Sequence, residues 1–181
     1  ISDYTDIDPL FGTLADLDAL IAGLHERGMK LVMDLVVNHT SDEHPWFQSS
    51  RELSSPWRDW YIWRPAREGH EPGTPGAEPT NAGCFFSGPG WQFDPASGQY
   101  YLHLFSPKQP DLNWENPAVR QAVYEMMRWW VERGVDGFRM DVINLISKTY
   151  PLVDGVVNGP DGLSYDPTPA VEGPRLHEFL R

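Results

Sequence analysis

The chain has 181 residues, with 14 Lys and Arg against 26 Asp and Glu, so its formal net charge is −12. This balance argues against a nucleic-acid partner, because phosphate binding requires a clustered excess of Lys and Arg. Apolar residues make up 40% and charged residues 22% of the chain, which predicts a folded globular protein. The single cysteine, Cys84, excludes an internal disulfide and any multi-cysteine metal site. No apolar run approaches the roughly 18 residues of a membrane span, so no membrane partner is expected.

The first predicted element is an amphipathic helix over residues 14–27, whose leucines recur on one face. Thr13 stands at its N-cap with Asp16 three residues on, which predicts a capping box. Gly28 suits the residue in left-handed conformation that commonly ends a helix. Residues 31–37 form a nearly continuous apolar run, typical of a strand buried on both faces of a parallel sheet. Polar residues end this strand.

The same order of elements returns later in the chain. Asn116 is predicted to cap a helix that starts at Pro117 and ends before Gly134. Residues 135–141 then form a second predicted buried strand. Two such units predict an α/β fold with a parallel sheet, whose functional side chains gather at the carboxyl ends of the strands. Residues 174–181 are expected to open a further amphipathic helix, and we interpret the chain as an internal piece of a longer protein.

The stretch between the two units is too long for an ordinary βα loop, which has about 2–6 residues. We therefore predict that it forms a small, irregular inserted subdomain. Four aromatic residues within it could stack sugar rings, but aromatic side chains also fill small cores, and we favour the core. These residues are Trp57, Trp60, Tyr61 and Trp63.

The strongest chemical signal is the segment Gly137-Phe-Arg-Met-Asp141. Side chains two apart in a strand share a face, so Arg139 and Asp141 project together. A guanidinium beside a carboxylate favours the ionised form, which suits a nucleophile. A structural ion pair fits the same spacing, and the residues alone leave both interpretations open.

The first predicted strand contains a charged residue and ends in two polar ones. An unpaired charge at Asp34 would cost several kcal/mol, so we expect a buried structural acceptor with Arg139 as its partner. Asn38 and His39 follow the strand and are expected at the mouth of a pocket.

The run from His39 to His44 includes two imidazoles and two carboxylates and could suggest a metal site. Zinc motifs with paired histidines use i, i+4 spacing on a helix, whereas these are i, i+5 in a strand-to-loop segment followed by Pro45. We therefore expect no metal here and no required cofactor.

Three segments, in order, resemble motifs of the α-amylase family of glycoside hydrolases (family 13), and most closely its oligo-1,6-glucosidase and α-glucosidase branch. They are Asp34-Leu-Val-Val-Asn-His39, Gln109-Pro-Asp-Leu-Asn113 and Gly137-Phe-Arg-Met-Asp-Val142. The resemblance implies a partial TIM (β/α)₈ barrel with a small irregular domain inserted after the third barrel strand. Residues 1–40 and 108–181 would then be barrel parts and residues 41–107 the inserted subdomain. The Pro/Gly-rich loop over residues 71–81 is longer than is usual in the family.

The resemblance also implies roles for individual residues. Asp141 would be the catalytic nucleophile, oriented by Arg139. The substrate would be bound by four residues, and two further residues would give structural support. The binding residues are His39, Phe86, Phe105 and Gln109, and the supporting residues are Asp34 and Asn38.

The implied reaction is a retaining double displacement, which needs a second carboxyl group about 5–5.5 Å from the nucleophile. The family takes this acid, and a third carboxylate that binds sugar hydroxyls, from later barrel strands, so residues 1–181 alone are expected to be inactive. Any structural calcium or magnesium ion would be held outside this stretch.

We therefore predict a retaining α-glucosidase acting on short α-glucosides, with Val142 favouring α-1,6 linkages as in isomalto-oligosaccharides. Two alternatives stay open: an isomerase or transglycosylase that forms trehalose or isomaltulose, and a non-catalytic domain of the same family. Val142 and the segment at Gln109 favour the hydrolase, and intact Arg139, Asp141 and His39 argue against the non-catalytic domain. The cysteine content suits a reducing compartment, so a cytoplasmic location is expected.

Overall fold

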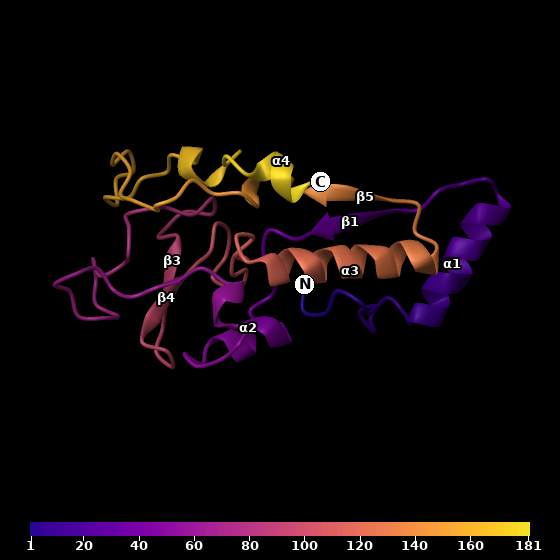
Figure 1. The fold of residues 1–181 in the computed structure, drawn as a ribbon, viewed down its shortest axis with the longest axis horizontal. Helices are drawn as coiled ribbons and strands as arrows, with labels where there is room; N and C mark the ends of the chain where they lie inside the picture. Colours follow the sequence, from indigo (N-terminus) through magenta and orange to yellow (C-terminus); the bar gives the residue numbers. More distant parts are fainter.

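The computed structural model describes residues 1–181, and its main feature is a parallel strand pair along which a long helix lies (Figure 1). β1 (Val32–Val36) and β5 (Gly137–Asp141) pair in register from the first residue to the last. Each strand follows a helix, α1 (Leu14–Glu26) before β1 and α3 (Pro117–Arg133) before β5. The two predicted helix–strand units and their parallel pairing are confirmed.

The helix ends follow the capping chemistry expected from the sequence. The Thr13 hydroxyl accepts the Asp16 N–H at 3.3 Å, and the Asp16 carboxylate accepts the Thr13 N–H at 2.8 Å, which completes the capping box. The Asn116 side chain accepts the Ala118 N–H at 2.9 Å at the start of α3. Gly134 ends α3 with φ of 114°, in the left-handed region that glycine adopts at helix ends.

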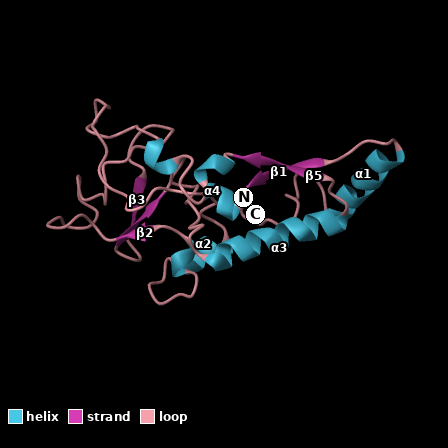
Figure 2. Ribbon diagram, turned by 45° about the horizontal axis from the view of Figure 1, so that its top comes forward, coloured by secondary structure: helices cyan, strands magenta, loops and turns pink.

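One face of the strand pair is covered by α3 and the other is open (Figure 2). Met126 and Trp130 of α3 pack with Leu35 of β1 in a core of 18 buried residues. On the open face, Val32 is 58% exposed and the Asp34 side chain is 54% exposed. The expectations of strands buried on both faces and of a buried Asp34 are therefore wrong for residues 1–181, because a two-stranded sheet with its helix on one side leaves the other side to solvent.

Between the two helix–strand units lies an irregular segment with its own antiparallel sheet. The segment begins with α2 (Pro45–Ser50), and its strands lie in the order β2 (Trp63–Arg64), β4 (Gln99–Leu102) and β3 (Trp91–Asp94). The aromatic cluster fills a core, as predicted, since three of its members are buried and the fourth packs against them. The buried members are Trp60, Tyr61 and Trp63, and the fourth is Trp57.

The chain after β5 returns to the inserted segment and crosses over it (Figure 1). The Ser164 N–H donates to the Asn81 carbonyl and the Gly83 N–H donates to the Ser164 carbonyl, both at 2.8 Å. Leu145 and Leu152 from this return segment join a second core with the strands of the inserted sheet. The sequence did not suggest this contact.

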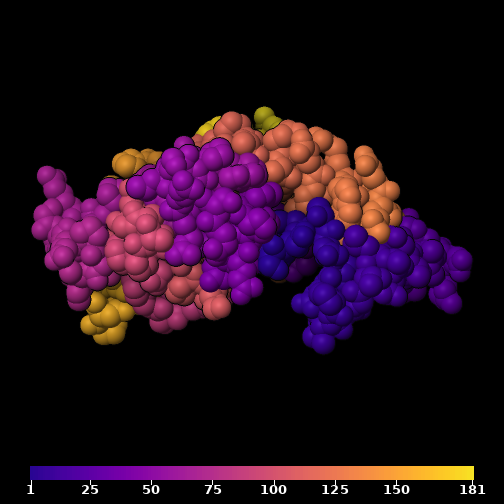
Figure 3. Space-filling view, turned by 90° about the horizontal axis from the view of Figure 1, so that it is seen from below, coloured from indigo at the N-terminus to yellow at the C-terminus, as the bar shows by residue number.

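The remaining elements are short. 3₁₀ turns span Arg58–Trp60, Ile143–Leu145 and Thr168–Ala170, and α4 spans Leu176–Phe179, within the residues expected to open a helix. The inserted segment makes up the bulk of one end of the molecule, and the indigo N-terminal segment extends at the other end (Figure 3). No helix has both the length and the apolar character needed to cross a membrane.

Candidate active site

Charged side chains from both parallel strands meet on the open face of the sheet. Asp34 and Arg139 lie opposite each other in the strand register. Arg139 Nη1 lies 2.8 Å from Asp34 Oδ1 and 2.5 Å from Asp141 Oδ1, so one guanidinium nitrogen bridges two carboxylates. The hydrogen bond to Asp34, followed by the charge of Asp141, raises the pKa of Arg139. The predicted partnership of Arg139 with Asp34 is confirmed, and the same guanidinium contacts Asp141.

The backbone turns sharply directly after Asp141. Val142 has φ of 41° and ψ of 36°, a left-handed conformation that a β-branched residue rarely adopts. Such residues cost about 1–3 kcal/mol and persist where the surrounding structure enforces them. Here the 3₁₀ turn that follows buries Leu145 in the second core. The turn therefore fixes the end of β5 at Asp141.

His39 lies in a group of aromatic and amide side chains. Its ring centre is 5.1 Å from that of Phe105, and the ring of Phe86 lies 5.6 Å from Phe105 on the outer side, with Phe86 66% exposed. The amide nitrogen of Gln109 lies 3.1 Å from His39 Nε2. The amide nitrogen of Asn38 lies 3.4 Å from the other ring nitrogen, Nδ1, so both ring nitrogens of His39 face amide groups. The structure thus brings together all four residues proposed to bind sugar.

Electrostatics favour the neutral form of His39. Burial, the largest effect, lowers the pKa of the imidazole, while the charges of Asp111 and Asp141 act in the opposite direction. Both carboxylates therefore lie within electrostatic reach of the ring. A neutral imidazole can donate a hydrogen bond to a sugar hydroxyl through one nitrogen or accept one through the other, and it adds no charge to the site.

Behind His39 lies a buried ion pair that sequence reasoning missed. Lys148 Nζ is 2.9 Å from Asp111 Oδ2, and the two side chains are 1% and 0% exposed. The ammonium also donates to the Leu145 carbonyl at 2.9 Å and to Asn38 Oδ1 at 3.3 Å. Asp111 in turn accepts the Asn38 amide at 3.1 Å and the Leu104 N–H at 3.0 Å.

This network connects three segments that are distant in sequence: the end of β1, the segment at Asp111 and the turn after β5. All three ammonium hydrogens have an acceptor, which is the condition under which a buried charge is tolerated. The side-chain nitrogen of Asn38 donates to Asp111 and its oxygen accepts from Lys148, so the side chain is held at both ends directly beside His39. Asp111 lay within the segment singled out from the sequence, but no local pattern pointed to Lys148.

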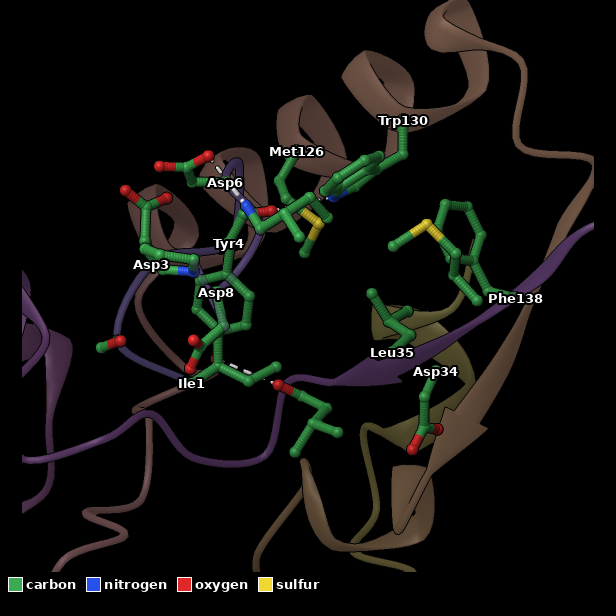
Figure 4. A pocket seen from close by; sticks show the side chains of 15 residues that line it. Ile1, Asp3, Tyr4, Asp6, Asp8, Asp34, Leu35, Met126, Trp130 and Phe138 are labelled. Carbon is green, nitrogen blue, oxygen red and sulfur yellow. Dashed lines mark hydrogen bonds between the residues drawn. The ribbon is translucent and has the colours of Figure 1, made fainter. Parts of the chain in front are cut away.

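A pocket on the other side of β1 is not part of this arrangement (Figure 4). Met126 and Trp130 face Leu35 and Phe138 across it, whereas the Asp34 carboxylate turns away from it. Three carboxylates of the N-terminal segment border the pocket, but no group of three or more His, Cys, Asp or Glu residues in the structure is arranged to hold a metal ion. These carboxylates are Asp3, Asp6 and Asp8.

His44, the second histidine of the run considered for a metal, caps α2. Its Nδ1 accepts the Trp46 N–H at 3.1 Å, and the two rings lie 4.4 Å apart. Burial lowers the pKa of His44 from 6.5 to about 4. The cap depends on an unprotonated Nδ1, so the same nitrogen that holds the helix start is the one that acid would protonate.

We expect the replacement His44→Asn to make the protein less sensitive to acid. Between pH 6.5 and about 4, the unfolded chain binds a proton at His44 that the folded chain does not, so the free energy of unfolding falls as the pH drops through this window. Asn keeps the cap and removes the titration. Urea unfolding at pH 7 and pH 5 should show a loss smaller by about 1 kcal/mol in the variant. Equal losses in the two proteins would contradict this assignment.

Comparison with known proteins finds relatives that match the whole length of this chain. Residues 1–181 match the family model described as the alpha-amylase catalytic domain. An oligo-1,6-glucosidase of Parageobacillus thermoglucosidasius is 56% identical over 182 residues, covering 100% of this chain and 31% of that protein. The chain thus spans about a third of the length of this curated relative.

Two solved structures show the same fold over almost the whole chain. A trehalose-6-phosphate hydrolase of Bacillus licheniformis superposes with a TM-score of 0.89 at 49% identity, covering 99% of this chain and 30% of that one. A trehalulose synthase of Pseudomonas mesoacidophila superposes with a TM-score of 0.86 at 42% identity, covering 99% of this chain and 31% of that one.

Proposed function

The chain belongs to the α-amylase family of glycoside hydrolases, and on this premise we propose that the protein carrying it is a retaining α-glucosidase. The catalytic domain of the family is a TIM barrel, and β1 and β5 with their helices are part of it. The observation that carries the proposal is the position of Asp141, at the carboxyl end of β5, in contact with Arg139 and within electrostatic reach of His39.

In the proposed reaction, a carboxylate oxygen of Asp141 attacks the anomeric carbon of a terminal glucose. A glucosyl–Asp141 bond forms as the glycosidic bond breaks, and a second carboxyl group about 5–5.5 Å away protonates the leaving oxygen. The same group then takes a proton from water, which attacks the anomeric carbon and releases glucose and the free carboxylate. Arg139, whose Nη1 lies 2.5 Å from Asp141 Oδ1, orients the Asp141 carboxylate for its attack.

The two other carboxylates near this site are already engaged by cations. Asp34 pairs with Arg139, and Asp111 is buried against Lys148. Neither is free to serve as the acid. We propose that the general acid and the third carboxylate come from a part of the protein outside residues 1–181, so that this chain supplies the nucleophile and one wall of the pocket.

The group around His39 would bind the glucose that is transferred. The neutral imidazole and the Gln109 amide offer hydrogen-bonding atoms for hydroxyls, and Phe105 and Phe86 offer apolar faces for the C–H surface of the ring. Asn38 would hold His39 in place through its contacts with Asp111 and Lys148.

For the linkage, we propose a preference for α-1,6 bonds, as in isomalto-oligosaccharides. Val142 directly follows the nucleophile, in the position that goes with α-1,6 specificity in the branch that this sequence resembles. The name of the oligo-1,6-glucosidase relative supports the same substrate class.

Replacing Val142 by Thr is expected to raise the kcat/KM for maltose relative to isomaltose by about tenfold. Both side chains are β-branched, so the strain of the left-handed backbone is nearly unchanged, while the hydroxyl offers the leaving sugar a new hydrogen-bond partner. The same change at Val156, which is 84% exposed on the return segment, serves as the control. An unchanged ratio in the Val142 variant would count against this specificity role.

A second candidate is an isomerase that passes the glucosyl group back to a hydroxyl of the released sugar. The similarity of the chain to a trehalulose synthase supports this second candidate. The test is to give the whole protein isomaltose, maltose, sucrose and trehalose 6-phosphate and to identify every product. Glucose from isomaltose supports the α-glucosidase, whereas rearranged disaccharide from sucrose supports the isomerase. No turnover of any sugar by folded protein would contradict both and favour the non-catalytic domain.

A further inference from the structure

The turn at residues 84–88 carries two aromatic side chains at the rim of the candidate site. Phe85 and Phe86 are 49% and 66% exposed, and their rings lie 5.3 and 5.6 Å from Phe105, which in turn contacts His39. Ser87 at the tip has φ of 74°, a left-handed conformation that is costly for a residue other than glycine. A turn of this kind needs support from neighbouring structure to hold one conformation.

The backbone of the turn is fixed at its start by the Phe85 N–H, which donates to the Leu104 carbonyl at 2.8 Å, and at its end by Tyr165 on the return segment after β5. The Gly88 N–H donates to the Tyr165 hydroxyl oxygen at 2.9 Å, and this hydroxyl donates to Asp161 Oδ2 at 2.5 Å. The ring is seated between two glycines, because a Cβ at Gly83 or at Gly159 would lie 2.5 Å from a carbon of the ring. The turn and the tyrosine are therefore fitted to each other in shape as well as in hydrogen bonding.

The return segment that carries Tyr165 is itself anchored. Asp154 accepts two hydrogen bonds from the Arg67 guanidinium, at 2.7 and 2.8 Å, and one from the Asn81 N–H at 2.8 Å. The Asn81 side chain exchanges two hydrogen bonds with the Gly155 backbone, at 2.8 and 2.9 Å. Together with the pairing of Ser164 to the inserted segment, these contacts hold the backbone on both sides of the loop that carries Tyr165 in place.

We propose that Tyr165 is a positioning residue for α-glucoside binding: its hydroxyl holds the turn at 84–88 so that Phe86 faces a sugar entering beside His39. This inference rests on the proposed function, because it assigns a sugar to the pocket. Tyr165 acts through the turn and makes no contact with Asp141, so its loss weakens substrate binding and leaves the chemical step intact.

The first test compares two Tyr→Phe variants of the whole protein. Tyr165→Phe should raise the KM for isomaltose about fivefold with kcat within twofold of the unaltered protein, as expected when the turn loses its hydrogen bond from Gly88 to the Tyr165 hydroxyl. Tyr100→Phe is the matched control, since the Tyr100 hydroxyl also accepts a glycine N–H, that of Gly73, at 2.9 Å, in a loop away from the turn. An unchanged KM, or an equal rise in the control, would overturn the proposal.

A double variant separates positioning from general loosening. If Tyr165 acts through Phe86, Tyr165→Phe should add little to the KM of a protein that already carries Phe86→Ala. Fully additive effects would contradict the proposed route.

A third measurement does not depend on activity. Chymotrypsin cleaves after exposed phenylalanines, and release of the turn should speed cleavage after Phe85 and Phe86 several-fold in Tyr165→Phe relative to Tyr100→Phe. Equal cleavage rates would show that the hydroxyl does not hold the turn. If the unaltered protein releases no glucose, the proposed function fails, whereas the cleavage rates still decide whether Tyr165 fixes the turn.

Discussion

Replacement of Asp141 by Asn is expected to lower the rate of glucose release from isomaltose by at least about 10⁴-fold, as the loss of other enzymatic nucleophiles does. Asn has nearly the same size and keeps the strand pairing, but its amide cannot form the glucosyl ester on which the double displacement depends. Arg139 keeps Asp34 as a partner, so the fold should survive. The measurement is kcat/KM in the whole protein, with melting temperature as the check on folding.

The matched control is Asp18→Asn, which removes another aspartate paired with an arginine, Arg133, at 2.7 Å on the surface of α1. This control should keep full activity.

In a further variant, Asp141→Gly, azide can take the place of the missing carboxylate, and a single displacement should then give the β-glucosyl azide. Substantial glucose release by Asp141→Asn, or an azide product of retained configuration, would refute the role given to Asp141.

Replacement of Lys148 by Met is expected to have the largest effect on stability, about 3–5 kcal/mol. The change leaves Asp111, which is fully buried, without its counter-charge. It also removes the ammonium that donates to the side-chain oxygen of Asn38. Lys108→Met is the control, since Lys108 is an exposed lysine near the same segment. Urea unfolding of the whole protein measures the difference.

The double variant Lys148→Met/Asp111→Asn tests the reason for that loss. Asn keeps an acceptor for the Leu104 N–H and removes the uncompensated charge, so the double variant should be more stable than Lys148→Met alone. If the double variant is the less stable of the two, the ion pair is not the cause of the loss.

Much of the fold could be predicted because its signals are local. The Thr13 capping box, the Asn116 cap and the Gly134 stop are each set by residues within one turn of the helix end. The partnership of Arg139 with Asp34 followed from the need of a charge in an apolar strand for a partner and from the expectation that the two strands are neighbours. The cap assignments need no knowledge of the rest of the chain, whereas the partnership of Arg139 with Asp34 needs only the pairing of two predicted strands.

The features that were missed or wrong depend on distant contacts. The exposure of Asp34 depends on what covers the second face of the sheet, which its own strand does not determine. Lys148 finds Asp111 only because the turn after β5 and the segment at Gln109 meet at the end of β1. Tyr165 meets Gly88 through a return segment whose path has no periodicity to reveal it.

The pairing of β1 with β5 also means that the candidate site depends on strand length as much as on residue type. Val36 lies opposite Asp141, and alternate side chains of β5 point to opposite faces of the sheet. Loss or gain of one residue within β5 would turn Asp141 toward α3 and bring its hydrophobic neighbours to the open face. A one-residue insertion or deletion between Gly137 and Asp141 would therefore disrupt the site even if every site residue were kept.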